Sequence, residues 1–237
     1  MIYAEILAGG KGTRMGNTEM PKQFLMIGEK PVLIHTVEKF LLQPRFNKII
    51  IVSPEVWISH CKDIIKKFIS KELAEKISIC KGGSDRNESI MSGIEYIREN
   101  FGIRDEDIIV THDAVRPFIT KRIIEENIIF AEKYGATDTV VEANDTIIKS
   151  TDGKYISEVP IRDEMYQGQT PQSFNINKLV SVYKSLTTEE KSCLTDACKM
   201  FVIKNEKVSL VKGENFNMKI TSQYDLDLAE MLINKSR

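Results

Sequence analysis

Short apolar segments alternate with amphipathic ones along much of the chain. Five segments rich in Ile and Val have the length of strands: Ile2–Leu7, Lys48–Ser53, Ile77–Cys80, Asp107–Thr111 and Thr139–Ala143. The first four are separated by stretches long enough to include a helix, which is the order that βαβ units produce. We therefore expect an α/β fold with a mostly parallel sheet.

Helical periodicity fills the intervals between these segments and continues to the C-terminus. The predicted helices are Pro31–Leu42, Ser59–Ser70, Ser84–Asn100, Thr120–Tyr134, Ile176–Ser185, Thr188–Asn205 and Ser222–Asn234. Ser84 is the expected N-cap of the third helix, and Ser222 with Asp225 forms a predicted capping box in the last. No repeat or low-complexity linker divides the chain, so residues 1–237 are expected to form one domain.

The composition excludes several classes of function. Lys and Arg number 33 against 34 Asp and Glu, so no overall basic field favours nucleic acid or an anionic membrane. No apolar run approaches the roughly 18 residues that span a bilayer, and the chain enters a strand without a signal sequence. We expect a cytoplasmic protein with no nucleic-acid or membrane partner. The four cysteines include no CxxC pair, so we predict no disulfide or metal role for them.

A glycine-rich turn follows the first predicted strand. Glycines at positions 9, 10 and 12 allow backbone N–H groups to approach an anion without interference from a Cβ atom. Lys11, Arg14 and Lys22 bring three cations to the same end of the sheet. A tight turn that only needs positive φ would explain the glycines but not the cations. We therefore predict a site for a nucleoside triphosphate.

Two better-known phosphate loops do not fit this turn. A P-loop requires Lys-Ser or Lys-Thr directly after its last glycine, whereas Gly12 is followed by Thr13 and Arg14. The dinucleotide fingerprint requires a third glycine where Met15 stands, and Gly16 comes one position late. Neither motif therefore accounts for the turn.

A second segment with paired glycines, GGSDRNES at residues 82–89, follows the third predicted strand and opens a helix. Its free N–H groups and the positive end of the helix dipole are expected at the carboxyl edge of the sheet. A capped helix start explains the short polar side chains on structural grounds alone. Because open α/β sheets bind ligands outside the carboxyl ends of their strands, we expect both a structural and a binding role.

A carboxylate and an arginine leave the end of the fourth predicted strand. Asp113 beside triphosphate oxygens would be repelled unless a divalent cation lay between them. It is therefore predicted as a Mg²⁺ ligand, direct or through water, or as a hydrogen-bond acceptor for a ribose. The structural alternative is an ion pair with Arg116. His112 is expected to pack or hydrogen-bond beneath the site rather than act as a base.

The regular alternation ends at Asn144. Two extended pieces, Asp145–Ser150 and Tyr155–Ile161, flank the turn signal Asp152-Gly153, which predicts a hairpin. A two-stranded ribbon is only marginally stable alone in water. This arm, at about residues 144–169, is therefore expected to lie on a neighbouring subunit.

Isolated polar groups follow within otherwise apolar patterns, at Arg162, Thr170, Thr195 and Lys219. Taken singly, they would be explained as a solvated arginine, ordinary polar side chains and a snorkelling lysine. A functional interpretation of these residues depends on the order of the motifs in which they stand.

The motifs LAGGKGTRMG, PKQF, GGSDRNESI, THDAVRPF, QTPQSF, LTDACK and NMKIT occur in the order found in the small cytidylyltransferases that join CTP to a polyol phosphate. The chain resembles this family, with its methylerythritol 4-phosphate and ribitol 5-phosphate branches, nearly end to end. The resemblance implies a Rossmann-like fold of the nucleotide-diphospho-sugar transferase type, with a protruding β-arm that joins a homodimer. It also implies Mg²⁺ dependence and release of pyrophosphate. Association with a ribulose-5-phosphate reductase is left open.

The resemblance assigns roles to individual residues. Cytidine and triphosphate would be held by Leu7, Ala8, Gly9, Gly10, Gly82, Gly83, Ser84, Asp85, Arg86, Asn87, Glu88 and Ser89, with Asp113 and Ala114 beside the ribose and metal. The acceptor phosphate would be held by Arg116, Thr146, Arg162, Thr170, Thr195 and Lys219. The predicted catalytic residues are Arg14, Lys22, Arg162 and Lys219. Arg14 and Lys22 match the pair that stabilises charge at the α-phosphorus, and Arg162 would complete the neighbour's site.

Within the family, the turn LAGG, the segment EMYQGQTPQSFNI and the motif LTDACK resemble the ribitol branch, as does the absence of Leu-Trp before QTPQ. The methylerythritol branch is the alternative. Two further classes stay open: a nucleotidyltransferase for a sugar 1-phosphate, which would not need the arm, and a non-catalytic nucleotide-binding subunit. A phosphate monoester with a second pKa of about 6 is mostly a dianion at neutral pH, so the implied reaction needs no catalytic histidine.

Overall fold

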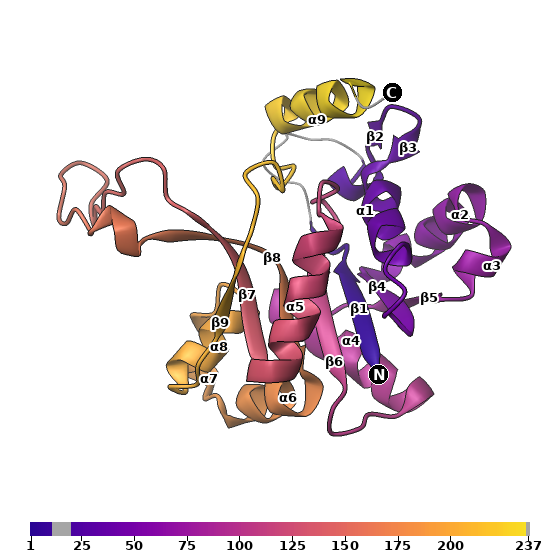
Figure 1. Ribbon diagram of the computed structural model, residues 1–237, viewed down its shortest axis with the longest axis horizontal. Helices are drawn as coiled ribbons and strands as arrows, with labels where there is room; N and C mark the ends of the chain where they lie inside the picture. Colours follow the sequence, from indigo (N-terminus) through magenta and orange to yellow (C-terminus); the bar gives the residue numbers. More distant parts are fainter. Residues whose placement is uncertain (11–19, 236–237) are drawn as a thin grey trace.

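A seven-stranded sheet forms the centre of the protein in the computed structural model, which describes residues 1–10 and 20–235 (Figure 1). The strand order is β5-β4-β1-β6-β8-β7-β9, and within this sheet only β8 runs antiparallel to its neighbours. The strands are β1 (Ile2–Leu7), β4 (Lys48–Ser53), β5 (Ile77–Lys81), β6 (Ile108–Asp113), β7 (Ala136–Glu142), β8 (Tyr166–Asn175) and β9 (Ser209–Lys212). The prediction of a mostly parallel sheet in an α/β fold is confirmed.

Helices cover both faces of this sheet. They are α1 (Val32–Leu41), α2 (Ile58–Phe68), α3 (Lys71–Ala74), α4 (Arg86–Phe101), α5 (Lys121–Tyr134), α6 (Ile176–Ser185), α7 (Thr188–Ser192), α8 (Ala197–Ile203) and α9 (Gln223–Lys235). Short 3-10 helices lie at Lys22–Phe24, Glu55–Trp57 and Arg162–Glu164. Buried side chains of α1, α2 and α5 pack on one face of the sheet, and those of α4, α6 and α8 pack on the other.

The alternation of side chains along each strand produces these two cores. In β1, Ala4 and Ile6 join the core under α1 and α5, whereas Tyr3 joins the core under α4. Because both faces are covered by helices, the strands read as continuous apolar runs. A polar residue inside such a run is therefore exceptional, and Glu5, in the middle of β1, is fully buried.

The strand order reverses at β1. The chain proceeds from β1 to β4 and β5 on one side and then returns to place β6 on the other. The register pairs Leu7 with Asp113, so the carboxyl ends of β1 and β6 lie together. In open α/β sheets this reversal point opens the crevice in which ligands bind.

A smaller structure lies beside this crevice. The hairpin of β2 (Met26–Ile27) and β3 (Lys30–Pro31) packs with α9 around a small apolar cluster that contains Ile27, Ile220 and Leu226 (Figure 1). The predicted capping box of α9 is confirmed. The Asp225 N–H donates to Ser222 Oγ at 3.3 Å, and the Ser222 N–H donates to Asp225 Oδ2 at 2.8 Å.

The segment between β7 and β8 projects from the body as an arm, at the left of Figure 1. The prediction of a paired two-stranded ribbon is wrong. The two extended pieces, both within the described residues, form a single antiparallel bridge, between Lys149 and Glu158, and no continuous ladder. The Lys154 and Tyr155 N–H groups donate hydrogen bonds to Asp152 Oδ1 and stabilise the tip. The side chain of Asp152 thus takes over part of the role that strand pairing would have had.

Three other details differ from the sequence predictions. The helix expected over Thr188–Asn205 is divided into α7 and α8, because Asp196 accepts the Lys199 N–H and starts a new helix. The N-cap of α4 is Asp85, which accepts the Glu88 N–H at 2.8 Å, and not Ser84. The strands β8 and β9 were not predicted as strands, since polar residues interrupt β8 and β9 is only four residues long.

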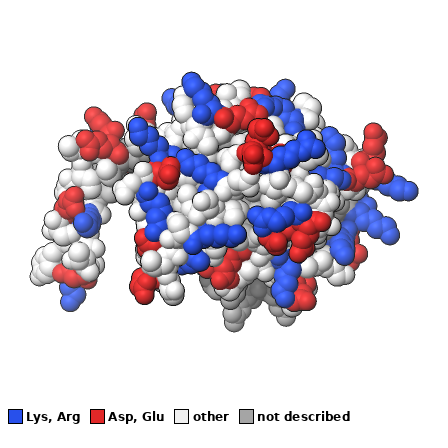
Figure 2. Space-filling model, turned by 90° about the horizontal axis from the view of Figure 1, so that it is seen from below, with Lys and Arg blue, Asp and Glu red and all other residues white. Residues whose placement is uncertain are grey.

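The surface carries mixed charge. Lys and Arg side chains are interspersed with Asp and Glu over the face shown in Figure 2, in keeping with a formal net charge of −1. In the described part of the chain, no helix is long and apolar enough to cross a membrane.

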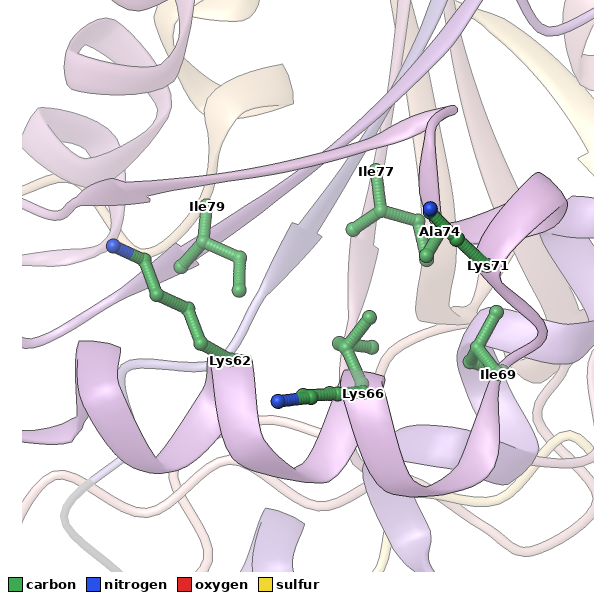
Figure 3. A pocket seen from close by; sticks show the side chains of 8 residues that line it. Lys62, Lys66, Ile69, Lys71, Ala74, Ile77 and Ile79 are labelled. Carbon is green, nitrogen blue, oxygen red and sulfur yellow. The ribbon is translucent and has the colours of Figure 1, made fainter.

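A hollow of about 500 Å³ lies between α2, α3 and the edge strand β5 (Figure 3). Ile77 and Ile79 face α2, and Lys62 and Lys66 extend from that helix at its rim. This hollow lies three strands away from β6 and carries no carboxylate in its lining. It therefore does not provide the groups that the predicted chemistry needs.

Candidate active site

Asp113, the last residue of β6, lies at the centre of a cluster of cations. Its carboxylate pairs with Arg86 from the start of α4, with Lys219 Nζ at 3.0 Å and with Arg116 Nε at 3.4 Å. The Asp113 side chain is 7 % exposed and that of Arg116 is 11 % exposed, whereas Lys219 reaches solvent at 41 %. Three segments distant in sequence therefore place positive charge at one end of the sheet.

The charge of Asp113 follows from these partners. Burial alone would raise the pKa of its carboxyl, but the charges of Arg86, Lys219 and Arg116 outweigh burial and hold the pKa well below its usual range. Asp113 is thus ionised at neutral pH. The three cations together exceed its single charge, so the cluster retains positive charge for an anionic ligand.

His112 lies beneath the cluster in a chain of hydrogen bonds. Its Nε2 is 3.1 Å from the Arg116 carbonyl oxygen, which can only accept, so Nε2 carries the proton. Nδ1 then accepts from Thr170 Oγ1 at 3.0 Å, and that hydroxyl accepts the Asp113 N–H at 3.1 Å. Burial lowers the pKa of His112 to about 4, so it is neutral. The structural role predicted for His112 is confirmed.

Asn217 stabilises the other side of the cluster. Its amide nitrogen donates to the Thr170 carbonyl at 2.9 Å and to Gln169 Oε1 at 3.0 Å. The backbone carbonyl oxygen of Asn217 in turn accepts a hydrogen bond from Arg116 Nη1 at 2.8 Å. The predicted residues Arg116, Thr170 and Lys219 are thereby brought together around Asp113.

The glycine turn after β1 begins at this same edge. The Ala8 N–H donates to the Val52 carbonyl at 2.8 Å, and the Ala114 N–H donates to the Leu7 carbonyl at 3.1 Å. A Cβ atom on Gly9 or Gly10 would meet no described atom within 4 Å, so packing does not demand glycine there. As far as the described residues go, the backbone at Gly9 and Gly10 is therefore open to a ligand. Arg14 and Lys11 lie outside the described residues.

Lys22 connects the turn region to the C-terminal segment. Its ammonium group donates to the Thr221 carbonyl, and the residue is 7 % exposed. The neighbouring Gln23 donates to the Ala8 carbonyl at 2.6 Å. The segment after the glycine turn is therefore fixed to both β1 and the start of α9.

The loop at residues 82–89 is held by its own side chains. The Ser84 N–H and hydroxyl both donate to Glu88 Oε2, and the Gly83 N–H donates to Ser89 Oγ at 3.2 Å. A Cβ on Gly83 would lie 2.4 Å from the Glu88 Cβ. The structural role predicted for this loop is thus confirmed. Within it, the buried Asn87 Oδ1 has no hydrogen-bond partner in the part of the chain that is described.

Two predicted site residues lie on the arm, away from Asp113. Arg162 and Thr146 are exposed there, and the ion pair recorded for Arg162 is with Asp163 at 3.9 Å. Thr195 is exposed just before α8, next to Asp196, whose charge acts on Arg86 of the cluster. Within one chain, the arm extends away from the sheet end that carries the cluster (Figure 1).

The metal-binding capacity of the site rests on Asp113. No group of three His, Cys, Asp or Glu side chains suited to a metal ion occurs within residues 1–10 and 20–235. Mg²⁺ at nucleotide sites is held by one or two carboxylates together with substrate phosphates and water. The donor set fits that mode of binding, with Asp113 as the protein contact, and does not fit an all-protein cage.

Two further polar residues lie near the cluster and were not predicted. Asp138 in β7 accepts Gln172 Nε2 from β8 at 3.1 Å, and burial, together with the charge of Asp196, raises the pKa of Asp138 to about 6. Gln172 Oε1 is buried without a partner among the described residues. The available signal for Asp138 was a charged residue between two threonines, directly before the apolar part of β7.

Comparison with known proteins places this chain in a family. The family model of 2-C-methyl-D-erythritol 4-phosphate cytidylyltransferase (IspD) matches residues 2–235. A ribitol-5-phosphate cytidylyltransferase of Lactiplantibacillus plantarum is 54 % identical over 235 residues, which cover 99 % of each chain.

Solved structures agree with this placement. The 4-diphosphocytidyl-2C-methyl-D-erythritol synthase of Anaerococcus prevotii has a TM-score of 0.79 at 27 % identity, over 98 % of this chain and 96 % of that one. The Francisella tularensis 2-C-methyl-D-erythritol 4-phosphate cytidylyltransferase shows the same fold at 24 % identity, with a TM-score of 0.79 over 97 % and 98 % of the two chains. The chain belongs to the IspD family of cytidylyltransferases, and its Rossmann-like nucleotidyltransferase fold is the one expected.

Proposed function

We propose that this protein transfers the cytidylyl group of CTP to D-ribitol 5-phosphate, giving CDP-ribitol and pyrophosphate. The convergence of Arg86, Arg116 and Lys219 on Asp113 at the strand-order reversal carries this proposal, because it provides a cationic crevice for phosphate groups. The choice of ribitol rests on the 54 % identity to the ribitol-5-phosphate cytidylyltransferase of L. plantarum.

The reaction requires no protein base. An oxygen of the acceptor phosphate, mostly a dianion at neutral pH, forms a bond to the α-phosphorus of CTP, and the bond from that phosphorus to the bridging oxygen breaks. Pyrophosphate leaves with the electron pair of the broken bond. His112 takes no part in proton transfer, because its Nε2 proton is donated to a carbonyl and its Nδ1 accepts from a hydroxyl. Catalysis then depends on positioning and on neutralisation of negative charge.

The proposed role of each residue comes from the family motif in which it stands. The backbone of residues 7–10 and the loop 82–89 bind cytidine and the triphosphate, with Ala114 beside the ribose. Lys22 and Arg14 stabilise charge at the α-phosphorus, and Arg116, Thr170, Thr195 and Lys219 bind the acceptor phosphate. Mg²⁺, when bound with the triphosphate beside Asp113, supplies further neutralisation of its charge.

A dimer is part of the proposal. The arm exposes apolar side chains, with Tyr155 77 % and Ile161 65 % exposed, and a partner subunit would cover them. Arg162 and Thr146 would then enter the neighbour's acceptor site, where the guanidinium group suits bidentate contact with phosphate. Association with a ribulose-5-phosphate reductase stays a prediction, which sedimentation of the mixed proteins tests.

A pyrophosphate-release assay tests the proposed function. The protein is supplied with CTP and Mg²⁺ and, in parallel, with ribitol 5-phosphate, 2-C-methylerythritol 4-phosphate and a sugar 1-phosphate. We expect the highest kcat/KM with ribitol 5-phosphate. A higher value for the methylerythritol compound would reassign the substrate within the family. CTP binding without pyrophosphate release from any acceptor would indicate a non-catalytic subunit.

A further inference from the structure

Four polar residues form a row across the middle of the sheet, on the face that α4 and α8 cover. The register pairs Glu5 of β1 with Thr111 of β6, Thr111 with Gln172 of β8, and Gln172 with Asp138 of β7. Paired residues on neighbouring strands point to the same face, and residues two positions apart along a strand do so as well. Asp113, two residues after Thr111, therefore shares its face with Asp138.

Asp138 lies at the open end of this row. Its side chain is only partly buried, whereas Glu5, Thr111 and Gln172 are buried. A Cβ atom on Gly168 would approach Asp138 Oδ2 at 3.8 Å, so the absence of a side chain at that position leaves room beside the carboxylate. The Cys198 thiol of α8 donates to the carbonyl of the adjacent Thr137 at 3.9 Å. The Asp138 carboxylate is thus oriented by Gln172, which donates to it at 3.1 Å, while it remains accessible.

The electrostatic surroundings of Asp138 differ from those of Asp113. Asp113 has three cationic partners, but Asp138 forms no ion pair within 4 Å among the described residues. The charge of Asp196 acts on the Asp138 carboxyl, and the charge of Asp138 in turn acts on Arg116. A carboxylate without a paired cation repels a phosphate group. This part of the crevice is therefore suited to the uncharged end of a substrate.

The Asp138 carboxylate is a hydrogen-bond acceptor in this part of the crevice. Because it is only partly buried, hydroxyl groups can donate to it, whereas Gln172 Oε1 is buried and Gln172 Nε2 holds the carboxylate in place. Strands β6 and β7 are separated by β8, and Asp113 lies two residues beyond the register of Asp138, so the two residues are roughly 12 Å apart. An extended polyol chain with its phosphate near Arg116 and Lys219 can reach Asp138.

We propose that Asp138, oriented by Gln172, binds hydroxyl groups at the end of the acceptor polyol remote from its phosphate and thereby determines which polyol phosphate is used. This inference rests on the proposed function, because it concerns the acceptor of the same reaction. A site that hydrogen-bonds a substrate hydroxyl discriminates strongly against an analogue that lacks it, since the buried acceptors are then left unpaired. Asp138 is thus a specificity-determining residue and takes no part in the bond changes at phosphorus.

The test compares acceptors of different length. Asp138→Ala and Asp138→Asn are assayed with ribitol 5-phosphate and with glycerol 3-phosphate, which has the phosphate but a shorter hydroxyl chain. Where glycerol 3-phosphate is not converted, its inhibition constant against ribitol 5-phosphate is measured instead. Asp63→Ala, an exposed carboxylate on α2, is the matched control.

We expect Asp138→Ala to lower kcat/KM for ribitol 5-phosphate at least about tenfold, with the KM for CTP and the constant for glycerol 3-phosphate changed by less than about twofold. Asp138→Asn, which preserves side-chain volume, should give an intermediate loss with unchanged Tm. Equal losses for both acceptors, or an unchanged preference for ribitol 5-phosphate in folded Asp138→Asn, would overturn the proposal. If the wild-type protein converts a different polyol phosphate, the proposed substrate is wrong, and the same comparison is made with that acceptor.

Discussion

Glu5 is a buried carboxyl group without a hydrogen-bond partner among the described residues. Burial raises its pKa well above the usual range, and the charge of Arg86 only partly offsets this effect. Glu5 is therefore protonated in the folded protein at pH values where it is ionised in the unfolded chain. Its contribution to stability is fully present below the unfolded pKa and is lost as the pH rises toward the folded pKa.

The substitution Glu5→Gln removes this pH dependence. A neutral amide of the same shape does not ionise in the unfolded chain, so the variant should gain stability relative to wild type above the unfolded pKa. The gain is about 1.4 kcal/mol for each pH unit by which the assay pH exceeds the unfolded pKa, and it stops growing once the pH reaches the folded pKa. Urea unfolding from pH 4 to 8 measures it. Parallel curves for the two proteins would show that Glu5 is not protonated in the folded state.

Lys22 tests charge stabilisation at the α-phosphorus. We expect Lys22→Ala to lower turnover by about a hundredfold or more while CTP affinity changes little, because an interaction made mainly in the transition state behaves in this way. Pyrophosphate release and calorimetric titration with CTP separate the two effects, and Lys62→Ala on α2 is the control. A large loss of CTP affinity with normal turnover would instead assign Lys22 to ground-state binding.

The sequence predicted the residues of this site unevenly. Arg116, Thr170 and Lys219 stand in recognisable motifs, and the structure brings them together around Asp113. Asp138 and Gln172 were missed, because their proximity depends on the antiparallel strand β8, which the sequence pattern did not reveal. The chain of hydrogen bonds through His112 likewise requires knowledge of tertiary contacts.

At the scale of elements, the strands with unbroken apolar runs were the most predictable. β1 and β4 have the predicted limits, and α6 does as well. The divided helix and the irregular arm were less predictable, since Asp196 and Asp152 use side-chain hydrogen bonds to redirect the backbone. Local capping interactions thus outweighed periodicity at these points.

The packing of α4 on β1 depends on one glycine. A Cβ atom on Gly93 would lie 2.0 Å from Glu5 Oε1 and 3.1 Å from Val52 Cγ2. Gly93→Ala should therefore destabilise the fold by about 1–3 kcal/mol from overpacking, against a gain of up to about 1 kcal/mol in helix propensity.

The double variant Glu5→Ala, Gly93→Ala should recover much of that loss, because the new methyl group fills space that the carboxyl vacates. A double-mutant cycle of unfolding free energies measures the coupling. Additive effects of the two substitutions would show that Gly93 is not selected by the volume of Glu5.

At the scale of the molecule, the apolar side chains of the arm are left exposed by the rest of the described chain. Ile148, Ile156 and Val159 are each more than half exposed, and a single bridge joins its two extended pieces. An apolar segment of this kind gains free energy when a second copy of the chain covers it. The isolated chain also leaves Arg162 away from the cluster at Asp113, so the acceptor site is proposed to be complete only in a dimer.

Subunit mixing tests this arrangement with two inactive variants, Arg162→Ala and Lys22→Ala. If Arg162 serves the neighbour's site, a heterodimer contains one site with both lesions and one site with neither. Activity should then reappear on exchange, approaching half of the wild-type value per heterodimer. If Arg162 serves its own subunit, each site of the heterodimer has one lesion and the mixture stays inactive. Native mass measurement must show that exchange has occurred. An inactive mixture of exchanged subunits would then mean that the arm only joins the subunits and that Arg162 does not serve the neighbour's site.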